Sequence, residues 1–129
     1  MNRTTLLRPY VESELSAART ARRARNNNLA WEHLERAHIL SQPSARLHTR
    51  VHAVMIVVAF AVLDLRELFG QVVRIAVAGI GSLVGRYPIG NTGRARVPIA
   101  QPMPVAPDLQ VILDRVEASL AAYDAGTMT

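Results

Sequence analysis

The 129-residue chain contains no cysteine, which excludes disulfide bonds, thiolate metal sites and cysteine nucleophiles. Any metal ion would therefore have to be bound by histidine nitrogen and carboxylate oxygen. Aromatic residues make up only 5% of the chain although 50% of it is hydrophobic. The core must therefore consist mainly of alanine, valine, leucine and isoleucine. Lysine is also absent, so arginine carries all of the basic side-chain charge.

Long hydrophobic runs are absent as well. The longest uninterrupted apolar run, residues 53–63, is shorter than the about 20 residues that a membrane-spanning helix needs. The longer segment 68–85 is interrupted by Gln71 and Arg74. Both runs therefore predict buried helices and no membrane partner. The N-terminus has no signal-peptide pattern, and we expect the protein to be cytoplasmic.

The net charge of +5 could attract nucleic acid or another polyanion. The arginines are spread along the chain, however, except in residues 19–25. There Arg19, Arg22 and Arg23 share one helical face. Cations near the C-terminal end of a helix are stabilised by its dipole, so we interpret this group as a solvated helix end. We do not expect nucleic acid as a partner.

Apolar residues at helical spacing predict an all-α protein of four to five helices in one domain, 1–129. Three asparagines at 26–28, Pro43 and Asp64 separate the first four helices. Four prolines lie between Pro98 and Pro107, so residues 86–107 are expected to form a loop and a Pro-rich extended strap. The predicted helices are 6–25, 29–40, 44–63, 65–84 and 108–123.

A weak internal repeat organises residues 6–85. At an offset of 34 residues Trp31 aligns with Leu65, and Leu34 aligns with Leu68. This period is that of the tetratricopeptide helix hairpin. We therefore predict two tetratricopeptide-like antiparallel hairpins, with the strap and the C-terminal helix covering a core that two hairpins cannot close alone.

All four histidines of the chain lie within twenty positions, on two consecutive predicted helices. Glu35 and His38 are three residues apart, and His48 and His52 are four apart, so each pair shares a helical face. In an antiparallel hairpin that turns at residues 42–43, His38 lies level with His48. The three inward-facing histidines are therefore expected to meet between the helices.

Glu14 is a further candidate because it lies on the apolar stripe of helix 6–25, where an unpaired carboxylate would be costly. We predict a divalent metal site, for Zn, Ni, Cu or Fe, in which Glu14 is a ligand or an acceptor that orients a ring N–H. The other predicted ligands are Glu35, His38, His48 and His52.

Other interpretations of this cluster remain open. The same residues could form a buried hydrogen-bonded network that only fixes helix packing, or one histidine could be a general base. A di-iron oxygenase needs a second Glu-x-x-His motif, which is missing, and no serine lies in a nucleophile motif. We therefore favour a non-enzymatic binding protein over an enzyme. The alternative is a tetratricopeptide-like interaction module, in which the Val- and Ala-rich segments 44–63 and 65–84 bind another protein or form a homodimer.

The segment 90–94, Gly-Asn-Thr-Gly-Arg, invites comparison with phosphate-binding loops, because glycines let backbone N–H groups approach an anion. It lacks both the P-loop lysine and the G-x-G-x-x-G spacing. We interpret it as a tight turn. The alternative is an anion site formed by Arg86, Asn91, Arg94 and Arg96.

Four motifs together resemble a family of short bacterial proteins that is catalogued as a domain of unknown function. They are HLERAHILSQ at 33–42, His-x3-His at 48–52, Gly70-Gln71 and GNTGRA at 90–95. The resemblance extends to about Asp108. It implies a compact helical protein of this size, and it brings no activity, cofactor or catalytic residue that could be carried over.

Overall fold

The computed structural model describes the backbone of residues 2–127 and the side chains of these residues except 78, 79, 83 and 127. The described chain is all-helical, which confirms the predicted fold class. Its five helices are α1 (Arg3–Arg23), α2 (Asn27–Ser41), α3 (Ala45–Ala61), α4 (Leu65–Leu83) and α5 (Pro107–Thr127).

Polar side chains cap the N-terminal ends of α2, α3 and α4. Asn26, Ser44 and Asp64 each accept a hydrogen bond from the backbone N–H three residues later. Such caps satisfy one of the free N–H groups at a helix start. Because Asn26 is the cap, α2 begins two residues before the expected start at residue 29. Pro107 occupies the first position of α5, where its missing N–H costs nothing.

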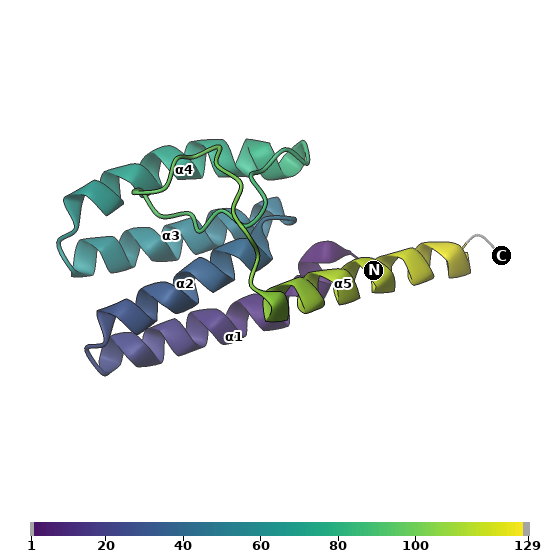
Figure 1. The fold of residues 1–129 in the computed structure, drawn as a ribbon, viewed down its shortest axis with the longest axis horizontal. Helices are drawn as coiled ribbons and strands as arrows, with labels where there is room; N and C mark the ends of the chain where they lie inside the picture. Colours follow the sequence, from purple (N-terminus) through teal and green to yellow (C-terminus); the bar gives the residue numbers. More distant parts are fainter. Residues whose placement is uncertain (1, 128–129) are drawn as a thin grey trace.

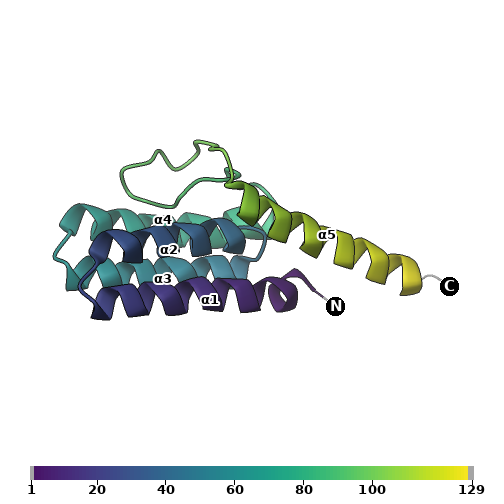
Figure 2. The same cartoon turned by 60° about the horizontal axis from the view of Figure 1, so that its bottom comes forward.

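The first four helices form two hairpins, α1 with α2 and α3 with α4. Figures 1 and 2 show the four helices side by side, with each hairpin antiparallel and α2 and α3 in contact between them. The contact between α2 and α3 brings the predicted histidine faces together. The likeness to tetratricopeptide hairpins stays a prediction.

The core lies between these helices. The apolar stripe predicted for α1 is buried over its whole length: Leu7, Val11, Leu15, Ala18 and Ala21. From α5, Leu109 and Val116 enter the same core, and the remaining residues of its predicted apolar face pack against it. Full burial of each such leucine or valine stabilises the fold by about 1.5–3 kcal/mol. The C-terminal part of α5 extends past the end of the other helices (Figure 2).

Residues 86–106, which we call the strap, contain no helix and arch over one side of the helices between α4 and α5 (Figures 1 and 2). Met103 N–H donates to the Ile89 carbonyl at 2.9 Å, which closes the strap into a loop. The strap therefore covers residues of α2 and α4 that would otherwise face solvent.

Within the described part of the chain, no helix combines the length and the apolar character needed to cross a bilayer.

Candidate functional site

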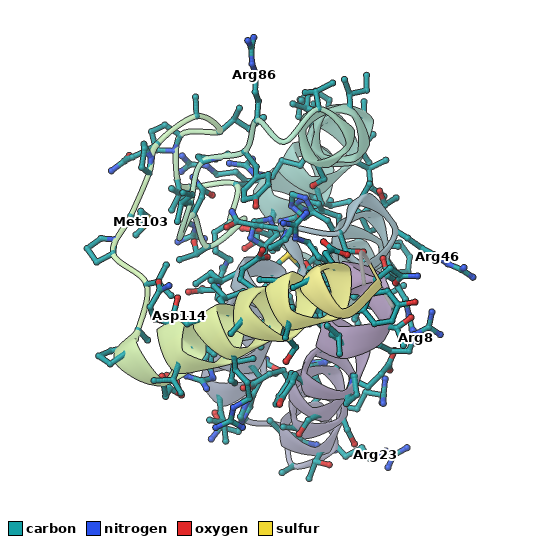
Figure 3. The ribbon with its side chains drawn as sticks, turned by 90° about the vertical axis from the view of Figure 1, so that its right-hand side faces the viewer. Arg8, Arg23, Arg46, Arg86, Met103 and Asp114 are labelled. Carbon is teal, nitrogen blue, oxygen red and sulfur yellow. The ribbon has the colours of Figure 1, made fainter. Side chains whose placement is uncertain are left out.

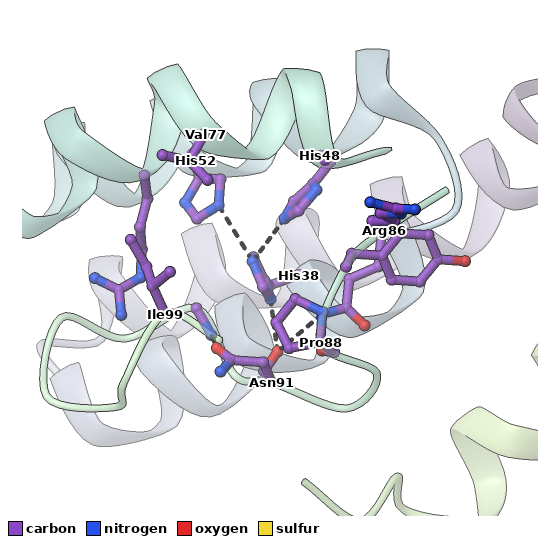
Figure 4. A pocket seen from close by; sticks show the side chains of 13 residues that line it. His38, His48, His52, Val77, Arg86, Pro88, Asn91 and Ile99 are labelled. Atoms are coloured by element: carbon purple, nitrogen blue, oxygen red, sulfur yellow. Dashed lines mark hydrogen bonds between the residues drawn. The ribbon is translucent and has the colours of Figure 1, made fainter. Parts of the chain in front are cut away.

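Three of the four histidines pack against one another beneath the strap. His38 comes from α2, and His48 and His52 come from successive turns of α3 (Figure 4). His38 Nε2 lies 2.8 Å from His48 Nε2 and 3.2 Å from His52 Nε2. All three side chains are buried. The sequence prediction that His38, His48 and His52 meet is therefore confirmed, and each offers a nitrogen within 4.8 Å of the others'.

The other ring nitrogen of His38 and of His48 faces an oxygen. His38 Nδ1 lies 2.8 Å from the Asn91 carbonyl oxygen, which can only accept a hydrogen bond. His48 Nδ1 lies 2.7 Å from Ser82 Oγ, and that hydroxyl already donates to the Gln42 carbonyl at 2.8 Å. Both Nδ1 atoms are therefore the protonated donors of their rings.

His52 is oriented by a chain of hydrogen bonds from α4. Its Nδ1 donates to Gln71 Oε1 at 2.6 Å. The Gln71 amide cannot be reversed, because its Nε2 donates to Glu67 Oε1 at 2.7 Å and to the Gly93 carbonyl at 2.8 Å. Gln71 and Glu67 are completely buried. The relay Glu67–Gln71–His52 therefore fixes the Nδ1–H tautomer of this ring as well.

Since each Nδ1 carries the proton, each Nε2 of the neutral rings presents a lone pair, and the three lone pairs converge. Burial keeps the rings neutral at physiological pH. It lowers the pKa of His48 to about 3 and that of His52 to about 4, and it lowers the pKa of His38 well below its usual range. Three acceptors that face one another have no donor between them, and a cation placed there could satisfy all three.

The strap is held over the histidines by Gln42 and Asn91. Gln42 Nε2 donates to the Pro88 carbonyl at 2.8 Å, and its Oε1 accepts from Gly90 N–H at 3.2 Å. The Asn91 side chain binds within the strap, donating to the carbonyls of Pro98 and Gln101 and accepting from Gly93 N–H. These bonds place the Asn91 carbonyl on the ring of His38.

A second set of contacts fixes the strap to α4. Ala95 lies so close to Gly70 that a side chain at position 70 would overlap its Cβ. The buried carboxylate of Glu67 accepts from Ala95 N–H at 2.9 Å and from Arg94 Nε at 3.1 Å. Arg94 also stacks on the Trp31 ring, 3.9 Å from its centroid. The same carboxylate thus binds both the strap and the Gln71 relay.

The three histidines line a cavity of about 60 Å³. Figure 4 shows Val77, Pro88 and Ile99 around the three rings. The cavity residues are His38, Gln42, His48, His52, Arg74, Val77, Gly81, Arg86, Tyr87, Pro88, Asn91, Gly93 and Ile99. A ligand bound to the histidines would therefore face this space.

A family of proteins of unknown function, DUF3703, matches residues 5–113, which include the three histidines, their hydrogen-bond partners and the whole strap. The chain belongs to this family. No curated protein and no solved structure matches it. The four motifs that carried the resemblance are all parts of the histidine site or of its cover in this DUF3703 chain.

Two carboxylates that the sequence placed among the ligands lie elsewhere in the DUF3703 chain. Glu14 binds His33 at 2.7 Å and Arg36 at 2.8 Å. Glu35 pairs with Arg94 at 3.2 Å, and burial raises the pKa of its carboxyl group. Each carboxylate is therefore neutralised by a nearby cation. The structure brings together three histidines and neither glutamate, so the ligand set contracts to His38, His48 and His52.

The residues considered for anion binding are also dispersed. Arg94 is engaged by Glu35 and Glu67, and Arg96 contacts Asp64 at 3.4 Å. The backbone carbonyl of Asn91 accepts a hydrogen bond from His38. The side chain of Arg86 points away from the protein in Figure 3. The segment 90–94 therefore acts as a cover for the histidines, and its backbone N–H groups do not form an anion cradle with these arginines.

Sequence reasoning missed the second set of site residues, Glu67, Gln71, Arg74 and Ser82. All four lie on α4. A signal was present, because Gln71 and Arg74 interrupt an otherwise apolar segment. A buried polar residue on an apolar helix needs a partner, and here the partners are His52 and the strap.

Proposed function

We propose that this protein binds a divalent transition metal ion through the Nε2 atoms of His38, His48 and His52. The observation that carries the proposal is the convergence of three Nε2 lone pairs while every Nδ1–H is already bound to an oxygen. Neutral imidazoles oriented by hydrogen bonds from their second nitrogen are the usual arrangement of histidine metal ligands.

The spacing of the nitrogens supports the same proposal. Tetrahedral coordination with bonds of about 2.0–2.1 Å separates ligand nitrogens by about 3.3 Å. The separations of 2.8 and 3.2 Å lie close to this value, so small ring movements would accommodate an ion. Three protein ligands leave one coordination position, which would face the cavity. Imidazole ligands suit Zn, Cu, Ni and Fe.

A purely structural histidine network is the main competing interpretation. Such a network would need an N–H group between the rings. The Asn91, Ser82 and Gln71 oxygens already take the Nδ1–H groups, so the neutral cluster has none to place there. Close contact between the rings would also gain little, because lone pairs that face one another repel. This favours a bound cation over packing alone.

The test begins with elemental analysis of the purified, tag-free protein, followed by calorimetric titration of chelator-treated protein with Zn, Ni and Cu. We expect one metal ion per chain. Absence of binding by all three metals in folded wild-type protein would refute the proposal, whatever the variants do.

The fourth histidine provides a matched control. His33 lies on the same helix as His38 and pairs with Glu14 outside the cluster. We expect His38→Ala and His52→Ala to lose metal binding at least 100-fold, and His33→Ala to retain it. Equal affinity in His38→Ala and His33→Ala would place the metal somewhere else. Circular dichroism of each variant checks that the helices persist.

Self-association is a second candidate function, favoured by an exposed apolar face of α3 and α4. Ten large apolar side chains on or beside these helices are at least 42% exposed: Val57, Phe60, Leu63, Leu65, Phe69, Val72, Val73, Val77, Ile80 and Val84. Contiguous exposed apolar patches commonly mark sites of protein–protein interaction. A second copy of the chain is the simplest occupant, because two such faces would bury each other in an isologous dimer.

Light scattering coupled to size exclusion tests the dimer. We expect Phe69→Glu to shift the protein to monomer and Val111→Glu, at an exposed site on α5, to leave the mass unchanged. A monomeric wild-type protein at micromolar concentration would reject self-association and leave this face for a different partner.

A further inference from the structure

Arg74 of α4 is a buried cation on the wall of the cavity beside the histidines. The residue is 7% exposed. It donates a hydrogen bond to the Val97 carbonyl, and among the described residues it makes no other hydrogen bond. A guanidinium group has five N–H donors, so most of those of Arg74 lack an acceptor. Among the described residues no Arg74 nitrogen is both buried and without a hydrogen-bond partner, so its remaining donors are accessible and can bind an acceptor in the cavity that Arg74 lines.

The surrounding charges do not supply that acceptor. Glu67 is the carboxylate that acts on Arg74, and its two oxygens are already bound by Gln71, Arg94 and Ala95 N–H. Among the described residues that line the cavity, none is acidic. A metal on the histidines would add two positive charges next to Arg74. In a poorly solvated site this repulsion is unfavourable unless an anion lies between the two cations.

We propose that the site binds a small oxyanion, which completes the coordination of the metal and pairs with Arg74. This inference rests on the proposed metal site. A carboxylate fits best, because its two oxygens match the fork of a guanidinium group and one of them can also bind a metal.

The size and lining of the cavity limit the anion. One water needs about 10–15 Å³ of such space, so about 60 Å³ admits an anion of a few heavy atoms. Val77, Pro88 and Ile99 form apolar walls, which disfavour a strongly hydrated, doubly charged ion. The structure therefore points to a small monocarboxylate of the size of formate or acetate.

The experiment uses wild-type protein loaded with one equivalent of Co(II), whose visible absorption reports coordination. We expect acetate and formate to change the spectrum with saturation. A Co(II) spectrum that acetate and formate leave unchanged would overturn the anion site and leave the metal site standing. Absence of Co(II) binding together with absence of Zn, Ni and Cu binding would instead reject the metal site and, with it, this inference.

The Arg74→Gln variant distinguishes the contribution of the arginine from that of the metal. We expect this variant to bind Co(II) with affinity equal to or higher than wild type, because a repelling charge is removed. Its acetate affinity should fall at least 10-fold. Arg66→Gln, at an exposed position on the same helix, is the matched control and should keep wild-type acetate affinity. Undiminished acetate binding in folded Arg74→Gln would overturn the role of Arg74. The wild-type titration decides the anion site even where the variant does not fold.

Discussion

Gly93 of the strap lies directly against the ring of His38. A Cβ atom built at Gly93 would be 2.5 Å from His38 Cδ2 and 2.7 Å from its Nε2, and the backbone at Gly93 has φ of +78°. Glycine is the residue that tolerates both the close approach and the left-handed conformation. This contact explains why a glycine follows Asn91 at this spacing: the strap could not otherwise lie on the histidine ring.

Gly93→Ala should therefore displace His38 or lift the strap. We expect metal affinity to fall at least 10-fold in calorimetric titration, because His38 loses its position and its bond to Asn91. Gly85→Ala is a control of the same backbone type, with φ of +67° and nothing within 4 Å of the added Cβ. It carries the conformational strain without the clash. Equal metal affinity in the two variants would mean that contact with Gly93 does not position His38.

Ser82→Ala should weaken metal binding without changing a ligand. The substitution removes the acceptor that orients His48 and the donor to the Gln42 carbonyl. Loss of such an outer hydrogen bond commonly costs about 10–100-fold in metal affinity. Ser119→Ala, which removes a serine hydroxyl bound only to the Arg115 carbonyl on α5, should bind metal as wild type does. Calorimetric titration measures the metal affinity of both variants. Equal affinities would contradict this role for Ser82.

The metal-free protein should lose stability as the pH falls below about 6.5. Burial lowers the pKa of His48 to about 3 and that of His52 to about 4 in the folded chain. In the unfolded chain both histidines have a pKa of about 6.5. Between pH 6.5 and 4 the unfolded state therefore binds more protons, and each histidine destabilises the fold by up to about 1.4 kcal/mol per pH unit.

Urea unfolding of chelator-treated protein at pH 7 and pH 5 measures this effect. The His52→Gln variant should show a smaller difference between the two pH values, because one of the titrating groups is gone. A wild-type free energy of unfolding that is the same at both values would contradict the buried neutral state of the cluster. Bound metal should make the loss steeper, since protons then also compete for the ligands.

Glu14→Gln should leave metal affinity within twofold of wild type. Glu14 binds His33 and Arg36, so its charge contributes to the packing of α1 on α2. We expect a loss of about 1–2 kcal/mol in the free energy of unfolding, since hydrogen bonds to a charged group are weakened. A large loss of metal affinity without a loss of stability would instead support the sequence-based assignment of Glu14 as a ligand.

Much of the local structure was predictable from short-range pattern. The stripe from Leu7 to Ala21 and the apolar face of residues 109–120 follow from helical periodicity, and both are in the core. The meeting of His38 with His48 and His52 was also predictable, because the two helices are consecutive and the turn between them is short. Only the distance from the turn was needed to place these residues side by side.

The rest of the site depends on contacts between distant segments. Asn91 binds a histidine 53 positions earlier, and Arg94 binds a glutamate 59 positions earlier. No periodicity encodes such pairs, since they depend on where the strap crosses the helices. The sequence pattern therefore identified Glu14 as a carboxylate that needs a partner and Glu35 as a neighbour of His38 on one helical face. It could not say that arginines would pair with both carboxylates.

The sequence by itself thus determined the helices, their apolar faces and the histidine cluster, because each depends on spacing within one helix or one hairpin. Only the tertiary structure decided the chemistry of that cluster. It placed an oxygen on every Nδ1 and covered the rings with the strap. It also set Arg74 beside them. The physical reason is that tautomer, burial and local charge are properties of all the groups surrounding a side chain, and those groups come from four separate segments of the chain.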